Sequence, residues 1–245
     1  LGCALAPASG LAAAGQRGSA RSAAQAATRI GTCDLGGATL LHVARRNVEF
    51  AGDVTSDADC RRVAKAVLAK WGRIDALVNS AGTTKFVKHS DLEGLSSEDI
   101  LGIFRVNVVG PFQMIRACAE ALRQSRGCVV NISSISSLLG TGSSIAYAAS
   151  KSALDTMSIA LSRALGPDVR VNVVAPGYVK TPWQVAAHGQ EGADELERRY
   201  AERAPLKAAA EPQDVADAIA WLCEGARRVT GEIIYVDGGM HITPP

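Results

Sequence analysis

Tyr147 and Lys151, in the run Tyr-Ala-Ala-Ser-Lys, are the residues of this chain whose types and spacing most directly indicate chemistry. They lie four residues apart in an Ala-rich stretch that favours a helix, so both side chains are expected on one helical face. To act as a base at neutral pH, a tyrosine must lower its pKa by about three units, or about 4 kcal/mol. An ammonium group about 5 Å away supplies on the order of 3 kcal/mol at an effective dielectric constant of about 20. The pair therefore predicts an acid–base centre, the alternative being a lysine that happens to lie one turn from a tyrosine on a solvated face.

A serine hydroxyl strengthens this interpretation. Ser134 precedes Tyr147 by thirteen residues and follows Cys128–Ile132, a short apolar run that is predicted to be a buried strand. The carboxyl end of a parallel strand is where open α/β sheets place their reactive groups. We therefore expect Ser134 to lie near the Tyr147 helix.

Further short motifs stand at intervals along the chain. They are Asn79-Ser80-Ala81-Gly82, Asn107 in Arg-Val-Asn-Val-Val-Gly, Pro176-Gly177 after an apolar run, and Asp237-Gly238-Gly239 near the end. In their order and spacing, and with Ser134 and Tyr-x-x-x-Lys, they resemble the short-chain dehydrogenase/reductase family over about residues 48–240. The resemblance implies a Rossmann-type α/β fold, a doubly wound parallel sheet in three α/β/α layers. It also implies an NAD(P)-dependent enzyme that transfers a hydride between nicotinamide and a secondary alcohol or ketone.

The resemblance implies a role for each matching residue. Tyr147 would be the general acid in ketone reduction and, as tyrosinate, the base in alcohol oxidation, while Lys151 would lower its pKa and bind the nicotinamide ribose. Ser134, selected over Ser133, Ser136 and Ser137 by its spacing, would stabilise charge on the substrate oxygen. Asn107 would anchor a water that relays protons from Lys151 to solvent. Besides Tyr147 and Lys151, the implied coenzyme contacts are Asp53 and Val54 at the adenine, Asn79, Ala81 and Gly82 on the adenosine side, and Pro176, Gly177, Val179 and Thr181 at the carboxamide.

The nucleotide-binding loop departs from the family pattern Gly-x-x-x-Gly-x-Gly. Its best register is Ala14–Arg21, where Gly15, Arg17 and Gly18 are candidate coenzyme contacts but alanine replaces two of the three glycines. An alanine forced to positive φ costs about 1–2 kcal/mol, and its methyl group crowds the phosphates. The alternative is an Ala-rich helix with incidental glycines. The departure motivates a competing hypothesis, a non-catalytic Rossmann-type scaffold, although the retained Ser-Tyr-Lys-Asn set favours an enzyme.

The second strand is placed by counting residues. Ala38–Val43 resembles a strand, but too few residues separate it from Asp53 for a parallel crossover, which takes about a dozen or more. Arg29–Cys33 is therefore predicted as the second strand, with a short crossover helix over residues 36–46 and a third strand at Val48–Ala51.

Asp34 follows the predicted second strand, ~20 residues after the glycine loop, where a carboxylate takes the adenosine ribose hydroxyls. A carboxylate there repels a 2′-phosphate and favours NAD as cofactor. Arg17 and Arg45 favour the alternative, NADP. Asp34 could also be an ordinary turn residue.

Apolar runs and helical patterns alternate along the chain, which predicts one domain over residues 1–245. Helices are expected from a capping box at Ser56–Asp59 to Lys70, near 97–107, over 111–124, from the Tyr147 motif to Gly166-Pro167, and over 212–223; further strands are expected at 169–174 and 232–236. Residues 181–211 lack strand signals and hold a charged helical stretch at 194–203, so they are predicted to form a substrate lid. His188 in this lid could be a catalytic base, but Tyr147 already fills that role.

The pocket is expected to be partly apolar, and the residues that suggest this are Leu138, Leu139, Ile145, Tyr178 and Trp183. Steroids, acyl thioesters, cyclic alcohols and sugars would fit, and an NADPH-dependent 3-oxoacyl thioester (acyl-carrier-protein) reductase is the alternative enzyme. The net charge of +2 predicts no nucleic-acid partner, and no apolar run reaches the ~20 residues of a membrane span.

Six scattered cysteines without CxxC pairs predict reduced thiols in a cytoplasmic protein and no metal site. Residues 1–33 contain no acidic residue and resemble an organelle transit peptide in composition. That interpretation is set aside, because removal of this segment would remove the first strand and helix. By analogy with the family, a homodimer or homotetramer is expected through the helices at residues 111–124 and 147–165.

Overall fold

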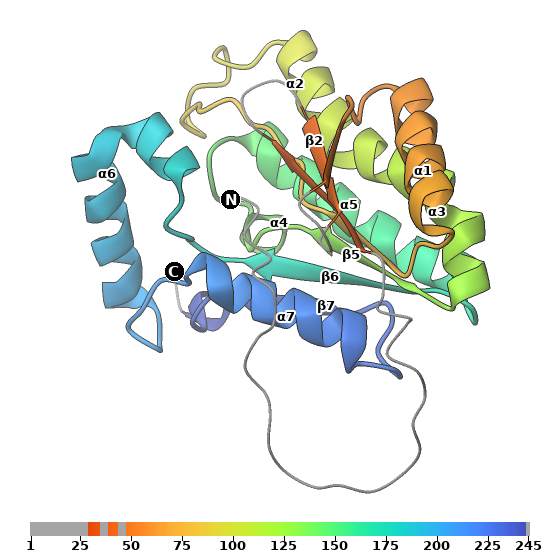
Figure 1. Cartoon of the computed structure of the whole chain (residues 1–245). Coiled ribbons are helices and arrows are strands. Elements are labelled where there is room, and N and C mark those ends of the chain that lie inside the picture. Colours follow the sequence, from red (N-terminus) through yellow and green to blue (C-terminus); the bar gives the residue numbers. More distant parts are fainter. Residues whose placement is uncertain (1–28, 35–38, 44–47, 244–245) are drawn as a thin grey trace, which may run out of the picture.

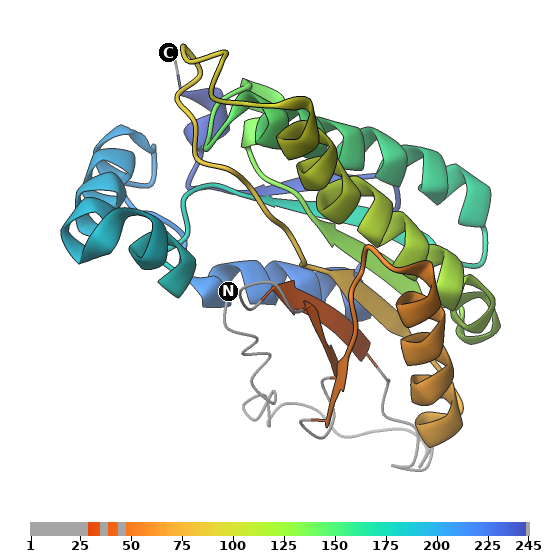
Figure 2. The ribbon, with the colours of Figure 1, turned by 90° about the horizontal axis from the view of Figure 1, so that it is seen from above.

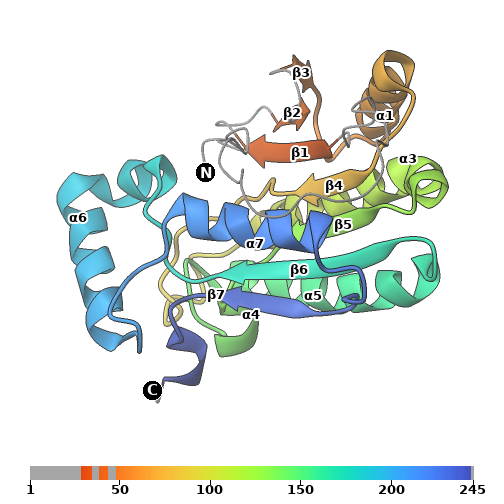
Figure 3. The same ribbon diagram turned by 60° about the horizontal axis from the view of Figure 1, so that its bottom comes forward.

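A seven-stranded β-sheet, ordered β3-β2-β1-β4-β5-β6-β7, forms the centre of the chain within the residues that the structure describes. The structure is a computed structural model, and it describes residues 29–34, 39–43 and 48–243. The strands are β1 (Arg29–Asp34), β2 (Thr39–Val43), β3 (Val48–Ala51), β4 (Ala76–Asn79), β5 (Cys128–Ile132), β6 (Arg170–Pro176) and β7 (Ile233–Val236). Figure 3 shows them in this order across the molecule.

Helices cover both faces of the sheet. They are α1 (Asp57–Trp71), α2 (Ser97–Phe104), α3 (Gly110–Ser125), α4 (Ser136–Leu139), α5 (Ile145–Leu165), α6 (Pro182–Arg203) and α7 (Pro212–Glu224), with a π-helical turn at Arg105–Val109 and a 3-10 turn at Met240–Ile242. α1, α3 and α5 lie on one face and α7 on the other (Figures 1 and 2). Leu122 packs against Leu77 and Val129 on the first face, and Leu222 packs against Val130 on the second. The predicted three-layer α/β/α fold is confirmed.

The strands β1, β4, β5, β6 and β7 are parallel. Every residue of β4 and β5 is buried, because helices cover both faces and both strands are almost wholly apolar. Asn79 at the end of β4 pairs in register with Asn131 of β5. The carboxyl ends of these strands therefore meet at one edge of the sheet, where Ser134 follows β5.

The edge formed by β1, β2 and β3 differs from the sequence prediction. Residues 39–43 form β2, which pairs antiparallel with both β1 and β3, so the predicted crossover helix over residues 36–46 is wrong. The number of residues between Val43 and Asp53 correctly excluded a parallel crossover. An antiparallel pair, however, needs only a short connection. The strand predicted at Arg29–Cys33 exists as β1, yet it lies directly beside β4 instead of one place further out.

Two helix starts fix segments near the edge where the parallel strands end. Ser56 caps α1 and accepts from the Asp59 amide, but Asp59 accepts from Asp53 N (2.9 Å), so the predicted capping box is only half present. A complete capping box begins α2, where Ser96 and Asp99 satisfy each other's backbone amides. The chain then passes through the π-helical turn into α3. Such turns occur often at functional sites, and this one carries Asn107.

The segment after β6 is α6, in which two helices meet at a kink, and the predicted helical stretch at residues 194–203 lies within the second of them. Gly189, at φ 71°, breaks its helical geometry. The part beyond this break is held to the sheet by Lys180, which pairs with Glu197 (2.8 Å), and by Tyr178, whose hydroxyl donates to Ala193 O (2.8 Å). Figure 3 shows α6 standing off the sheet, beyond the ends of the parallel strands.

Candidate active site

Tyr147 and Lys151 lie on one face of α5, as their spacing predicts. Ser144 caps this helix by accepting from the Tyr147 amide (3.2 Å), which sets Tyr147 in the first turn. The Lys151 ammonium lies 5.6 Å from the centroid of the Tyr147 ring and donates to Ile132 O at the end of β5 (2.8 Å). Lys151 is only 4% exposed, so its charge acts in a medium where water screens it little.

Burial dominates the electrostatics of this pair. Burial lowers the pKa of Lys151 to about 8, and the charge of Asp155 opposes that shift. Burial also raises the pKa of Tyr147 to about 12, against the lowering effect of the nearby Ser134 hydroxyl. The expected depression of the Tyr147 pKa by Lys151 is therefore not seen, because the cost of burying a tyrosinate is the larger effect. For Tyr147 to act as a base near neutral pH, a further positive charge at the site would have to lower its pKa.

Ser134 lies where β5 ends, between two serines that are engaged elsewhere. Its Oγ donates to Ser136 Oγ (3.1 Å) and accepts from the Ser136 amide (3.2 Å), which fixes the hydroxyl near Tyr147. Ser133 instead donates to Lys151 O (3.4 Å), and Ser137 donates to Ser134 O (2.8 Å). This geometry agrees with the spacing argument that selects Ser134.

Asn107 is fully buried in the π-helical turn and links two segments of the site. Its amide donates to Thr83 O and to Ser150 Oγ (both 2.9 Å) and accepts from Thr83 N (2.8 Å). Ser150 in turn donates to Tyr147 O (2.7 Å). Asn107 therefore holds the first turn of α5 against the loop after β4, a positioning role that the sequence did not indicate.

The described residues fit the ribose of a nicotinamide coenzyme. Among the described residues, the Lys151 ammonium donates a hydrogen bond to Ile132 O alone, which leaves two of its three donors for a ribose diol. Gly82 lies beside it, since a methyl group there would be 3.5 Å from Lys151 Nζ and 3.6 Å from Asn107 Oδ1. Asn79 donates to Asn131 Oδ1 (2.8 Å), but its own buried Oδ1 accepts no hydrogen bond from the described residues. That oxygen is a ready acceptor at the end of β4, beside buried Ala81.

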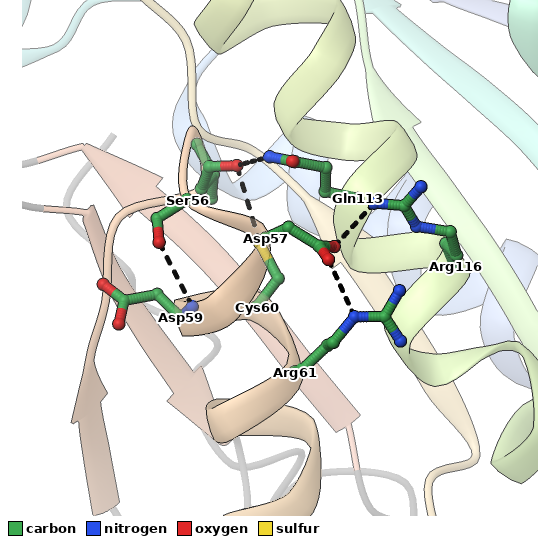
Figure 4. Close-up of polar contacts among 8 residues, drawn as sticks. Ser56, Asp57, Asp59, Cys60, Arg61, Gln113 and Arg116 are labelled. Carbon is green, nitrogen blue, oxygen red and sulfur yellow. Dashed lines mark hydrogen bonds and ion pairs between the residues drawn. The ribbon is translucent and has the colours of Figure 1, made fainter.

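The segment predicted to flank adenine is held in place from two sides (Figure 4). The Val54 carbonyl accepts from Gln113 Nε2 on α3 (2.7 Å) and from Cys60 Sγ on α1 (3.5 Å). The Asp53 carboxylate accepts from the amide and hydroxyl of Thr55 (both 2.8 Å). Gln113 was not predicted, because a lone glutamine in a helical run gives no sign of the loop that it holds.

The turn after β6 is built around Gly177. Pro176 O accepts from the Ile135 amide (3.0 Å), which ties this turn to the Ser134 loop. A methyl group at Gly177 would collide with the Tyr200 hydroxyl of α6, so packing alone already requires glycine there. Val179 bridges to Ala210, and Thr181 is the buried N-cap residue of α6.

A pocket of about 550 Å³ opens above Ser134 and Tyr147. Phe86, Trp183 and His188 form an aromatic wall, with the Phe86 ring centroid 5.8 Å from Trp183 and 5.1 Å from His188. Tyr178 and Trp183 line the pocket as predicted, whereas Leu138, Leu139 and Ile145 are solvent-exposed residues outside its lining. Phe86 was missed, since nothing in the loop after Gly82 marks it.

Some candidates lie beyond what the structure describes. Gly15, Arg17, Gly18 and Arg45 fall outside the described residues. Asp34 is the last residue of β1, at the same edge of the sheet as Asn79. Within the described ranges, no three His, Cys, Asp or Glu side chains gather as metal ligands, and no helix is long and apolar enough to cross a bilayer.

Comparison with known proteins shows four similarities. A family model described as enoyl-(acyl carrier protein) reductase matches residues 8–241. The candidate ketoacyl reductase 2 of the granaticin polyketide synthase of Streptomyces violaceoruber is 37% identical over 191 residues, 78% of this chain and 75% of that protein. The crystal structure of a candidate short-chain dehydrogenase/reductase from Burkholderia xenovorans has a TM-score of 0.72 and 39% identity, over 78% of this chain and 74% of that one. A structure of ElxO with NADP bound has a TM-score of 0.70 and 26% identity, over 78% and 77% of the two chains.

Proposed function

This chain belongs to the short-chain dehydrogenase/reductase family and is an NAD(P)-dependent oxidoreductase acting on CH–OH or ketone groups, and we propose that Tyr147, Ser134 and Lys151 carry its chemistry. The observation that carries the proposal is the convergence of the three side chains at one edge of the sheet. The Ser134 hydroxyl is the neighbour that lowers the pKa of the Tyr147 phenol, and the Lys151 ammonium lies over the Tyr147 ring.

Each side chain has a distinct task in ketone reduction. The bound nicotinamide supplies the hydride. Tyr147, protonated at neutral pH because burial raises its pKa, gives its proton to the substrate oxygen. Ser134 donates a hydrogen bond to that oxygen as negative charge develops on it. Lys151 stabilises the tyrosinate that remains and holds the ribose, while Asn107 fixes the helix turn that carries Tyr147.

For the substrate, we propose a largely apolar cyclic alcohol or ketone. The aromatic wall of Phe86, Trp183 and His188 offers flat faces above Tyr147, and no carboxylate is among the described residues that line the pocket. Trp183 and His188 lie on α6 before its break at Gly189, so this part of the helix would act as the lid. The second candidate is a 3-oxoacyl thioester, favoured by the likeness to a ketoacyl reductase and by Lys88 in the lining, which could face an acidic carrier.

For the coenzyme, we propose NAD. The support is the sequence argument from Asp34, ~20 residues after the glycine loop, where a carboxylate would repel a 2′-phosphate. β1, which ends at Asp34, lies beside β4 and not in the second-strand position that this argument assumes. The NADP held by the solved relative ElxO is the reason to measure both coenzymes.

We also propose a homodimer or homotetramer in the cytoplasm. Phe112 of α3 and Val109 before it are 39% and 44% exposed, which supports a contact between copies at this helix. Cys60 and Cys118 are buried thiols, as suits a reducing compartment.

Coenzyme binding gives the direct test. The chain contains Trp71, Trp183 and Trp221, so NADH and NADPH can be titrated while tryptophan quenching and energy transfer to the nicotinamide are followed. Saturation by NADH below about 1 mM, with weaker NADPH binding, is expected. Tighter binding of NADPH would overturn the assignment of NAD, and binding of neither in that range would overturn the proposed function.

A further inference from the structure

Asp155 is a buried carboxylate that the proposed mechanism does not use. It lies one turn beyond Lys151 on α5 and is only 7% exposed. Its Oδ1 atom is buried and accepts no hydrogen bond from the residues that the structure describes. A charge in such a place is costly unless another charge compensates it, so its presence calls for a partner.

The groups around Asp155 come from three segments. On α5, the facing charge is the Lys151 ammonium. Burial raises the pKa of the Asp155 carboxyl, and the Ser133 and Ser137 hydroxyls of the segment after β5, with the Lys151 charge, lower it. From β7, Tyr235 faces it, and the pKa of that phenol is raised by burial first, then by the charges of Asp155 and Asp237.

Two further titratable groups lie behind Tyr235. His241 stacks on the Tyr235 ring (4.4 Å between centroids) and is bonded to Asp237 (2.8 Å between Nδ1 and Oδ2). Asp237 therefore has its own partner. Of the cations in the described part of the chain, Lys151 is the one that interacts with Asp155.

We propose that Asp155, buried one helical turn beyond Lys151 on α5, is a positioning residue that keeps Lys151 charged. The proposal rests on the proposed role of Lys151 in the site. Asp155 is not among the residues that line the pocket, and it acts through Lys151.

The sign of the expected effect follows from the electrostatics. Burial lowers the pKa of Lys151 to about 8, and Asp155 is the group that opposes this shift. Removal of its charge leaves burial unopposed, so the Lys151 pKa falls further. Ketone reduction needs the ammonium and the Tyr147 proton, so its rate is lost as pH rises through their pKa values. Without Asp155, that loss must begin at lower pH.

The test is the pH profile of kcat/KM for ketone reduction by Asp155→Asn, which keeps the shape of the side chain. The alkaline limb is expected to move by about one pH unit toward acid, while the rate at pH 6 changes by less than about threefold. Asp168→Asn, the same substitution at an exposed site after α5, should leave the profile unchanged. A uniform loss of rate with no displacement of the limb would mean that Asp155 is merely structural, and would overturn the proposal.

A second measurement needs no turnover and isolates Lys151. NADH affinity is followed against pH in Tyr147→Phe and in Tyr147→Phe/Asp155→Asn, where the tyrosine no longer titrates. The pH at which affinity is lost should be lower by about one unit in the double variant. If Asp155→Asn folds poorly, Asp155→Ser removes the same charge and must give the same displacement. If NADH affinity is lost at the same pH in the single and the double variant, the proposal is overturned. If NADH affinity does not depend on pH in either variant, the role of Lys151 itself is contradicted.

Discussion

At the scale of single residues, the site is governed by burial. Burial disfavours the charged form of both Tyr147 and Lys151. One neighbour opposes this effect in each case, Ser134 for the tyrosine and Asp155 for the lysine. A free enzyme with this arrangement holds a protonated tyrosine at neutral pH, which suits a proton donor. Alcohol oxidation needs the tyrosinate instead. We expect the positive nicotinamide of NAD⁺ to favour alcohol oxidation by lowering the Tyr147 pKa.

Ser134 gives the first residue-scale prediction. Ser134→Ala removes the hydrogen bond to the developing oxyanion, so kcat should fall by about 10²–10³-fold with little change in NADH affinity. Ser137→Ala is the matched control, because this serine is three residues away and donates to the Ser134 carbonyl without facing the pocket. The kcat of Ser137→Ala should fall by less than about tenfold. A larger loss in Ser137→Ala than in Ser134→Ala would show that the wrong serine has been assigned.

How far the site could be predicted is clearest at this scale. The spacing of Ser134, Tyr147 and Lys151 along the sequence is enough to place them together, because a strand end and a helix face fix their directions. Phe86 and Asp155 could not be found in this way. Phe86 lies on a loop, and no periodic sequence pattern predicts the path of a loop. Asp155 looks in the sequence like an ordinary polar residue of a helix.

At the scale of elements, local signals predicted most of the helices and strands. β5 and β3 have the predicted bounds, since short apolar runs between turns leave little choice. β2 was missed because only a parallel crossover was weighed for residues 38–43, and the antiparallel alternative satisfies the same residue count. The π-helical turn at Arg105–Val109 has no sequence signature, since it differs from an α-helix only in its hydrogen bonds.

The α2 cap gives the element-scale prediction. Ser96 Oγ accepts from the backbone amide of Asp99 (3.1 Å). The Asp99 carboxylate binds Lys85 (2.7 Å), which lies in the loop between β4 and α2. Ser96→Ala should therefore lower the free energy of unfolding by about 1 kcal/mol, as measured by the midpoint of denaturant unfolding. Ser97→Ala, at the exposed next position, should change it by only a few tenths. Equal effects of the two substitutions would contradict the capping role.

At the scale of the whole molecule, one sheet edge collects the functional groups from distant parts of the sequence. Asn79 ends β4, Ser134 and Gly177 follow the neighbouring strands β5 and β6, and α5 brings Tyr147 and Lys151 up to them from the face that it covers. Two apolar clusters, one on each face, hold this edge together. The alternation of apolar runs and helices predicted that architecture. The sequence also indicated a segment after β6 without strands and with a charged helical stretch at residues 194–203, but not the path of that segment. Its path depends on tertiary contacts such as Tyr178 with Ala193.

The measurement that tests the central claim most directly is the Tyr147→Phe variant of the intact protein, compared with Tyr235→Phe. The loss of the phenolic proton at position 147 should lower ketone reduction by about 10²–10⁴-fold and leave the folded state and NADH affinity nearly unchanged. Tyr235→Phe removes a hydroxyl from a phenol outside the pocket lining and should retain full turnover. A Tyr147→Phe enzyme that keeps a tenth or more of the wild-type rate, with NADH still bound, would contradict the assignment of Tyr147 as the proton donor.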